Sequence, residues 1–202
     1  MKIIELVIDE DNYNVGVEAI SVVENPAIEV PYVALNNQKI ELKVENEEKR
    51  ILLGPALIPN KQIYRHDEEM GEYYIYFSQD TVRQASQLFL KSGNQHNSSY
   101  EHEYKLNDMT VVESWIVEDS NNDKANVYGY DLPKGTWMVS MKVDNDEVWN
   151  SVLEGNVKGF SIEGHFADKL HAKSMRKTDS DVQLLERIKS IIDAYEKKRN
   201  TK

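Results

Sequence analysis

Short runs of β-branched and aromatic residues recur along this chain, and turn-forming residues separate them. The clearest runs are "KIIELVID", "EYYIYF", "MTVVESWIVED" and "TWMVSMKVD". Runs of this length and composition, bounded by Gly, Pro, Asn and Asp, are typical of β-strands. The sequence therefore predicts a mixed α+β domain with a mostly antiparallel sheet.

Two short helices are predicted between these strands. In "SQDTVRQASQLFLKSG", apolar residues recur at helical spacing, Ser78 or Asp80 can cap the start, and Gly93 can end the helix. In "DEVWNSVLEG", a polar residue among 144–146 can cap the start and Gly155 can end the helix. Local capping signals thus place both helices.

The composition changes after residue 166. Residues 167–181 are polar and lack periodicity, which indicates a linker, whereas the apolar residues of 182–202 share one face of an amphipathic helix. We therefore predict one domain over residues 1–166, a polar linker over 167–181 and a C-terminal helical tail over 182–202.

Composition and charge exclude several kinds of function. The chain of 202 residues has no cysteine, so disulfides, thiolate metal sites and cysteine nucleophiles are excluded. A formal net charge of −11 argues against nucleic-acid binding. The sequence has no apolar run of the roughly 20 residues that a membrane helix needs, and its N-terminus lacks the pattern of a signal peptide. We expect an intracellular protein without cofactor or metal, and with other proteins as partners.

The segment "GFSIEG" places Ser161 between two apolar residues of a predicted strand. Strand alternation could simply turn this hydroxyl to solvent, or the serine could be a nucleophile beside a base. His102 is the best candidate base, because the two acids that flank it in "YEHEY" would favour the imidazolium form. His96 is a second candidate, whereas His66 lies in a predicted turn and His171 in the linker.

Several blocks of the sequence resemble the prohead (procapsid maturation) proteases of tailed bacteriophages, in the branch found in phages and phage-like prophage elements. The blocks cover most of residues 15–166 and are "ISVVENPAIE", "EHEYKLNDMTVVESWIVED" and "GYDLPKGTWMVSMKVDNDEVWNSVLEGNVKGFSIEG". The resemblance implies a serine endopeptidase that cleaves scaffold or capsid-protein segments inside the immature capsid and often cleaves itself. It also implies a barrel-like core related to herpesvirus assemblin, with Ser161 as nucleophile and His102 as base.

The third catalytic residue is less constrained. Our first choice is Glu113, an acid inside the otherwise apolar segment "VVESW", although alternation could turn it to solvent. Glu163 and His165, both just after Ser161, are alternatives. For His165, the resemblance adds that assemblin-like proteases use a second histidine in place of an acid. In many prohead proteases a segment resembling "SLVxxPA" follows the serine strand, whereas here "ISVVENPA" lies near the N-terminus. This order suggests permuted strands, which could bring Glu18 to the site.

The resemblance also predicts partners and location. The partners would be the phage scaffold and major capsid proteins, with a homo-oligomer as a further option, and the location would be the host cytoplasm, inside the assembling procapsid. The tail helix would contact these proteins, be removed by self-cleavage, or pack on its own domain. The alternative function is a non-catalytic procapsid or virion component that retains the protease fold, and a different hydrolase on a similar fold is a third.

Overall fold

The computed structural model of the chain describes residues 2–9, 16–27, 33–34, 49–68 and 70–169. Contacts divide the chain into two units, Met1–Phe166 and Ala167–Lys202. The described part of the second unit contains the short strand β12 (Ala167–Asp168). The predicted tail helix and the linker from residue 170 onward lie outside the described residues.

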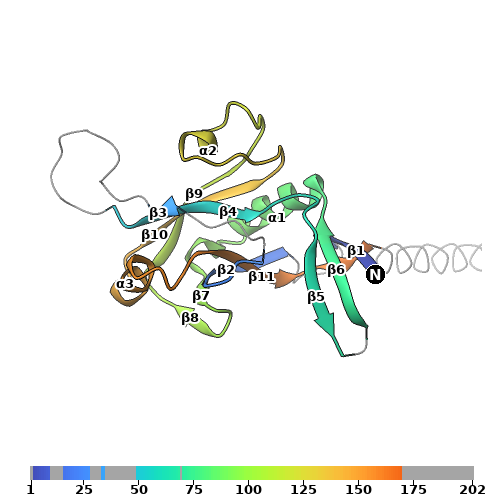
Figure 1. Cartoon of the computed structure of the whole chain (residues 1–202), viewed down its shortest axis with the longest axis horizontal. Helices are drawn as coiled ribbons and strands as arrows, with labels where there is room; N and C mark the ends of the chain where they lie inside the picture. The colour runs from blue at the N-terminus through green and yellow to red at the C-terminus, as the bar shows by residue number, and fades with distance from the viewer. Residues whose placement is uncertain (1, 10–15, 28–32, 35–48, 69, 170–202) are drawn as a thin grey trace, which may run out of the picture. The chain divides into compact units, whose positions relative to one another are not determined.

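One sheet of the first unit has the strand order β11-β2-β7-β8 and carries Ser161. Its strands are β2 (Gly16–Val23), β7 (Ser98–Tyr100), β8 (Tyr104–Leu106) and β11 (Gly159–His165). β2 pairs antiparallel with β11 on one side and parallel with β7 on the other (Figure 1). The "ISVVENPA" segment near the N-terminus therefore lies directly beside the "GFSIEG" strand, as the permuted order suggested.

A second sheet, with the order β3-β4-β10-β9, supplies much of the hydrophobic core. Its strands are β3 (Val33–Ala34), β4 (Ile51–Leu57), β9 (Met109–Ile116) and β10 (Trp137–Val143), and they pair antiparallel. β10 lies between two partners and is buried along almost its whole length, which suits its run of Trp, Met and Val. Trp137 packs edge to face against Phe89 at 5.5 Å between ring centroids.

A third sheet contains β1 (Lys2–Val7), β6 (Gly71–Phe77) and β5 (Ile63–Asp67), neighbours in that order. β1 runs parallel to β6, and β5 and β6 form an antiparallel hairpin. His66 belongs to strand β5, so its predicted position in a turn is wrong. The turn comes just after it, where the Asp67 carboxylate accepts a hydrogen bond from the backbone N–H of Met70 at 3.1 Å.

Both predicted helices are confirmed. In α1 (Gln79–Lys91) the side chain of Ser78 accepts a hydrogen bond from the backbone N–H of Thr81, and in α3 (Asp146–Leu153) Asn145 caps Val148 in the same way. Two further elements were not predicted, the 3-10 helix η1 (Asn94–His96) and α2 (Lys124–Val127). The latter is a short helix whose start is fixed by a reciprocal pair of hydrogen bonds between Asp123 and Asn126.

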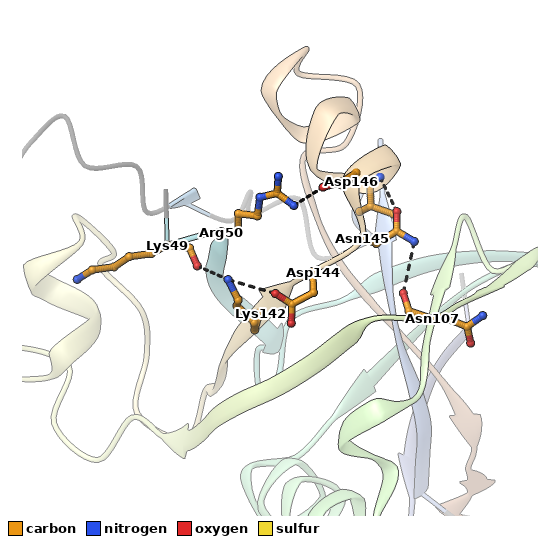
Figure 2. Close-up of polar contacts among 8 residues, drawn as sticks. Lys49, Arg50, Asn107, Lys142, Asp144, Asn145 and Asp146 are labelled. Carbon is orange, nitrogen blue, oxygen red and sulfur yellow. Dashed lines mark hydrogen bonds and ion pairs between the residues drawn. The ribbon is translucent and has the colours of Figure 1, made fainter. Parts of the chain in front are cut away.

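Polar contacts fix the start of α3 to the second sheet (Figure 2). Nη1 of Arg50, just before β4, lies 2.5 Å from Oδ1 of Asp146. Nζ of Lys142, in β10, lies 3.3 Å from Oδ1 of Asp144. The helix held in this way ends near Gly155, which has φ +76, and the chain then enters β11. The short helix α3 thus leads into the "GFSIEG" strand, which pairs with β2.

The architecture is compatible with the predicted α+β class, since it is mostly β-sheet with three short α-helices among the described residues. The pairings among the described strands are mainly antiparallel, with β1–β6 and β2–β7 as parallel exceptions. The described strands form separate sheets rather than a closed barrel, which corrects the prediction of a barrel-like core. Within their own sheets, β2 and β10 each have a partner strand on both sides. Their backbone hydrogen bonds are therefore formed without closing the sheet into a barrel.

Candidate active site

Ser161 lies on β11 directly opposite Ser21 of β2. Directly opposed residues of an antiparallel pair share a face, and alternation adds Glu163 to the same face. The Ser161 side chain is partly exposed and lines a pocket of about 290 Å³. No described residue forms a hydrogen bond with its hydroxyl. The hydroxyl of the predicted nucleophile is therefore accessible, and it has no hydrogen-bond partner in the part of the chain that the structure describes.

His102 lies in the turn that joins β7 to β8, and its backbone has φ +61. The preceding residue, Glu101, also has positive φ, at +50. Such left-handed conformations of non-glycine residues cost on the order of 1–3 kcal/mol and tend to occur at functional sites. The backbone N–H of Glu101 donates to the carbonyl of Val22 at 3.2 Å, which ties the turn to β2. The turn thus holds the imidazole, 42% exposed, against the Ser21 face of the sheet.

Four polar side chains form a connected cluster, which we call the Ser21 cluster: Ser21, Ser99, His102 and Glu163. The Ser21 hydroxyl lies 2.8 Å from Oγ of Ser99 and 2.9 Å from Nδ1 of His102, and it donates to Oε1 of Glu163 at 2.5 Å. Ser99 also donates to this carboxylate oxygen, and Nδ1 of His102 lies 3.3 Å from it. The cluster joins three strands and the turn between β7 and β8.

Counting protons assigns the tautomer of His102. The hydroxyl proton of Ser21 is directed to Glu163, so toward His102 the Ser21 oxygen can only accept. The Glu163 carboxylate is also an acceptor. Nδ1 of His102 therefore carries the proton, and in the neutral ring Nε2 bears the lone pair. Among the described residues, none contacts Nε2 by a hydrogen bond or ion pair.

The environment of Glu163 favours its ionised form. Burial acts to raise the pKa of this carboxyl, but hydrogen bonds from Ser21 and Ser99 and the proximity of His102 outweigh it, and the pKa is lowered. The Glu163 side chain is 33% exposed. A carboxylate at this position would stabilise the positive charge on an imidazolium, as the acid of a catalytic triad does.

Glu113 lies on β9, in a different sheet from the Ser21 cluster, and has other partners. Its Oε2 atom lies 2.5 Å from Nζ of Lys124 and accepts a hydrogen bond from Ser140 at 2.6 Å. These two interactions lower the pKa of its carboxyl. The structure describes no hydrogen bond or ion pair between Glu113 and His102, so the catalytic role of Glu113 stays a prediction.

The remaining candidates lie apart from the Ser21 cluster. Nε2 of His165 is 3.9 Å from Oε1 of Glu18, and both side chains are largely exposed. Nδ1 of His96 lies 3.1 Å from the hydroxyl of Thr110. His171 lies outside the described residues. Of the acids and histidines considered, the structure thus brings together His102 and Glu163.

Sequence reasoning missed Ser21 and Ser99. Both are buried, with Ser21 0% exposed, and a buried hydroxyl needs a hydrogen-bond partner. A usable signal was the single hydroxyl in the apolar run "AISVV". That signal does not identify the hydrogen-bond partners of Ser21, because the pairing of β2 with β11 and β7 joins residues that are far apart in the chain.

Two glycines of β11 are explained by close packing. A Cβ at Gly164 would lie 2.0 Å from the carbonyl oxygen of Gly16, and one at Gly159 would lie 2.5 Å from Cγ of Pro26. These glycines therefore allow β11 to approach β2 and the segment that follows it. The absence of a side chain at these two positions is thus explained by packing within the fold.

The described residues contain no group of three or more His, Cys, Asp or Glu that could hold a metal ion. In the same part of the chain, no helix has the length and apolar character needed to span a bilayer.

Comparison with known proteins gives one finding about the family. No curated protein and no solved structure matches the chain. A family model does match, over residues 38–170, which is well over half of the chain, and its description is "Putative phage serine protease XkdF". The matched segment includes three of the four residues of the Ser21 cluster, together with Ser161. The chain therefore belongs to this family of phage serine proteases.

Proposed function

We propose that the chain is a serine endopeptidase that cleaves scaffold or capsid-protein segments during maturation of a phage procapsid, and that it also cleaves itself. Membership of the phage serine protease family supports the protease role. The observation that carries the catalytic assignment is the placement of Nδ1 of His102 against Ser21 and Glu163, with Nε2 left without a hydrogen-bond partner among the described residues. The structure describes no hydrogen bond between Ser161 and His102, so their approach during the reaction is part of the proposal.

The proposed roles follow from access and from partners. Ser161 is the nucleophile, because its hydroxyl is partly exposed, borders a pocket and is unpartnered among the described residues. Ser21 is closer to His102 in the hydrogen-bond network but is 0% exposed, so a peptide carbonyl would not reach it without rearrangement. Glu163 is the orienting acid, in preference to Glu113, because it lies 3.3 Å from Nδ1 of His102.

In the proposed reaction, Nε2 of His102 takes the hydroxyl proton as Ser161 attacks the peptide carbonyl carbon. The C–N bond then breaks, the imidazolium gives that proton to the leaving amine, and an acyl-serine remains. Water, activated by the same nitrogen, hydrolyses the acyl-serine. Glu163 accepts the hydrogen bond from Nδ1–H throughout and stabilises the imidazolium.

Ser21 and Ser99 act in this scheme as positioning residues. Each donates to the carboxylate of Glu163, which fixes the acid against the sheet. A carboxylate that is held by two hydroxyl groups does not have to reorganise when the imidazole becomes charged. Both serines lie on paired strands, so the sheet itself sets their geometry.

The test is co-expression of the chain with the scaffold and major capsid proteins of its phage, followed by intact mass spectrometry of every chain. The wild type should release fragments, and Ser161→Ala should release none. Ser151→Ala, on α3, is the matched control and should cleave normally. Self-cleavage would appear as a shortened form of the protein itself that is absent in Ser161→Ala.

A covalent probe identifies the nucleophile directly. A fluorophosphonate should label the wild-type protein on the peptide that contains Ser161, as mapped by tandem mass spectrometry. Labelling of Ser21 or Ser99 instead would overturn the assignment of Ser161. Uncleaved chains of identical mass for wild type and Ser161→Ala, recovered from properly assembled particles, would favour the alternative of a non-catalytic procapsid component.

A further inference from the structure

Most of the residues that line the pocket beside Ser161 are apolar, and Arg65 and His165 are its basic residues. Residues from β4, β5, β6 and β11 line it, among them Leu57, Ile63, Phe77 and Phe160. Arg65 is part of the same wall, and no Asp or Glu is among the described residues that line it. Arg65 and Ser161 thus line the same pocket, and no carboxylate is among its described lining residues.

The strand geometry places Arg65 on the pocket side of β5. Ile63 and Arg65 are two residues apart and therefore share a face of the strand. Their cross-strand partners are Ile75 and Tyr73, and Ile75 also lines the pocket. The orientation of Arg65 is thus set by the β5–β6 hairpin.

Arg65 has little within the protein to satisfy its charge. Its Nη1 atom donates to the carbonyl of Tyr64 at 3.0 Å, and it forms no ion pair with any described residue. Partial burial lowers the pKa of its guanidinium. The Arg65 side chain is nevertheless exposed by surface area, so its planar guanidinium fork is open to a carboxylate or phosphate ligand, for which it is well suited.

A second pocket, of about 670 Å³, adjoins the first and shares Ala27, Ile63 and Arg65 with it. Glu24 lines this second pocket but forms no ion pair with Arg65. Arg65 therefore lines both pockets, including the one that contains Ser161. These pockets leave room for a peptide side chain with an apolar stem and a charged end.

We propose that this pocket binds an acidic side chain of the substrate, Glu or Asp, at a position directly flanking the scissile bond, with Arg65 as the group that recognises its carboxylate. The apolar walls contact the methylene groups of that side chain. This inference rests on the proposed protease function, because it names the substrate class of the same site. It predicts cleavage sites with acid next to the cut.

The first test measures binding, independently of cleavage. The peptides are acetyl-Ala-Ala-Glu-amide and its Gln analogue, in which the only difference is the side-chain carboxylate. Titrated into the full-length Ser161→Ala protein, the Glu peptide should bind at least about tenfold more tightly, as expected for a charge-assisted hydrogen bond. Arg65→Gln should abolish the difference, Arg65→Lys should retain part of it, and Arg83→Gln, whose arginine pairs with Glu118 on the surface, should leave it unchanged.

Equal affinity for the two peptides, or no binding of either, would overturn the inference. So would a preference for the Glu peptide that persists in Arg65→Gln.

The second test measures cleavage of a diverse peptide mixture, with Ser161→Ala as the blank. Ser161-dependent cuts should be enriched in Glu or Asp at a position flanking the scissile bond, and Arg65→Gln should lose that enrichment. Cuts that depend on Ser161 but show no acidic preference would reject the pocket assignment and leave the protease function standing. If no cut depends on Ser161 while the Glu peptide still binds through Arg65, the proposed function fails and the carboxylate site remains.

Discussion

The hydroxyl of Ser21 donates a hydrogen bond of 2.5 Å to Oε1 of Glu163, which joins the second strand of the chain to the strand that carries Ser161. The same carboxylate oxygen lies 3.3 Å from Nδ1 of His102. A hydrogen bond between a buried hydroxyl and a carboxylate is stronger than one between neutral groups. This contact therefore couples the geometry of the proposed acid to the pairing of β2 with β11.

Glu163→Gln should reduce kcat/KM on the order of 10³-fold, because an amide at this position favours the wrong tautomer of His102. Glu113→Gln is the matched control, since it makes the same change in an acid with Lys124 and Ser140 as partners. Its activity should stay within about threefold of wild type, and its free energy of unfolding should fall by no more than about 1 kcal/mol. Steady-state kinetics and urea unfolding measure both. Loss of activity only in Glu113→Gln would restore Glu113 as the third catalytic residue.

Ser21→Ala should lower kcat by about 10- to 100-fold with little change in KM, because it removes a donor to Glu163 without touching the substrate pocket. Ser98→Ala is the control, since Ser98 is equally buried but contacts Met141 through a weak bond at 3.9 Å. Stopped-flow or steady-state assays with a cleavable peptide give both constants. If the two variants behave alike, the Ser21 cluster has only a structural role.

The elements that could be predicted from the sequence are those with local signals. Ser78 caps α1 and Asn145 caps α3, and each lies within a few residues of the bonds that it makes. The strand "EYYIYF" was also recognisable, because its aromatic residues suit a pleated surface. Information of this kind is present in a short window of sequence.

The elements that escaped prediction depend on distant pairing or on very short structure. His66 was expected in a turn, yet its backbone pairs with Glu72 across the β5–β6 hairpin. Chemistry and resemblance indicate Ser161 and His102, but no local signal links Ser21 to either residue. The contact of Ser21 with Glu163 spans a sequence separation of 142 residues. Only the completed sheet defines such a site.

Acid should weaken the contribution of Glu163 to stability. The pKa of this carboxyl is lowered from its ordinary value of 4.5 on folding, so the unfolded chain binds the proton more tightly than the folded one. The contribution is then complete above pH 4.5 and is lost as the pH falls through the folded pKa. Urea unfolding of wild type and Glu163→Gln, from about pH 6 to about pH 3, should show their difference in unfolding free energy shrinking. A difference that stays constant or grows toward acid would contradict the direction of the shift.

Gly164→Ala should destabilise the protein by about 2–4 kcal/mol, because its Cβ would lie 2.0 Å from the backbone oxygen of Gly16 and the pairing of β2 and β11 would have to shift. Gly71→Ala is the control for conformational strain alone, since Gly71 has φ +69 and nothing within 4 Å of its would-be Cβ. That variant should lose only about 1 kcal/mol. Chemical unfolding measures both, and equal losses would show that the close approach at Gly164 is relaxed at little cost.

The central position of β2 has a consequence for synthesis on the ribosome. β2 is made early, but its partner β11 is the last strand of the first unit to be translated. Until β11 emerges, the nascent chain has neither Ser161 nor Glu163, and Ser21 and His102 have no acid to complete their network. A sheet that depends on contacts so distant in sequence forms late in folding. The order of the strands therefore ties the assembly of the candidate active site to completion of the domain.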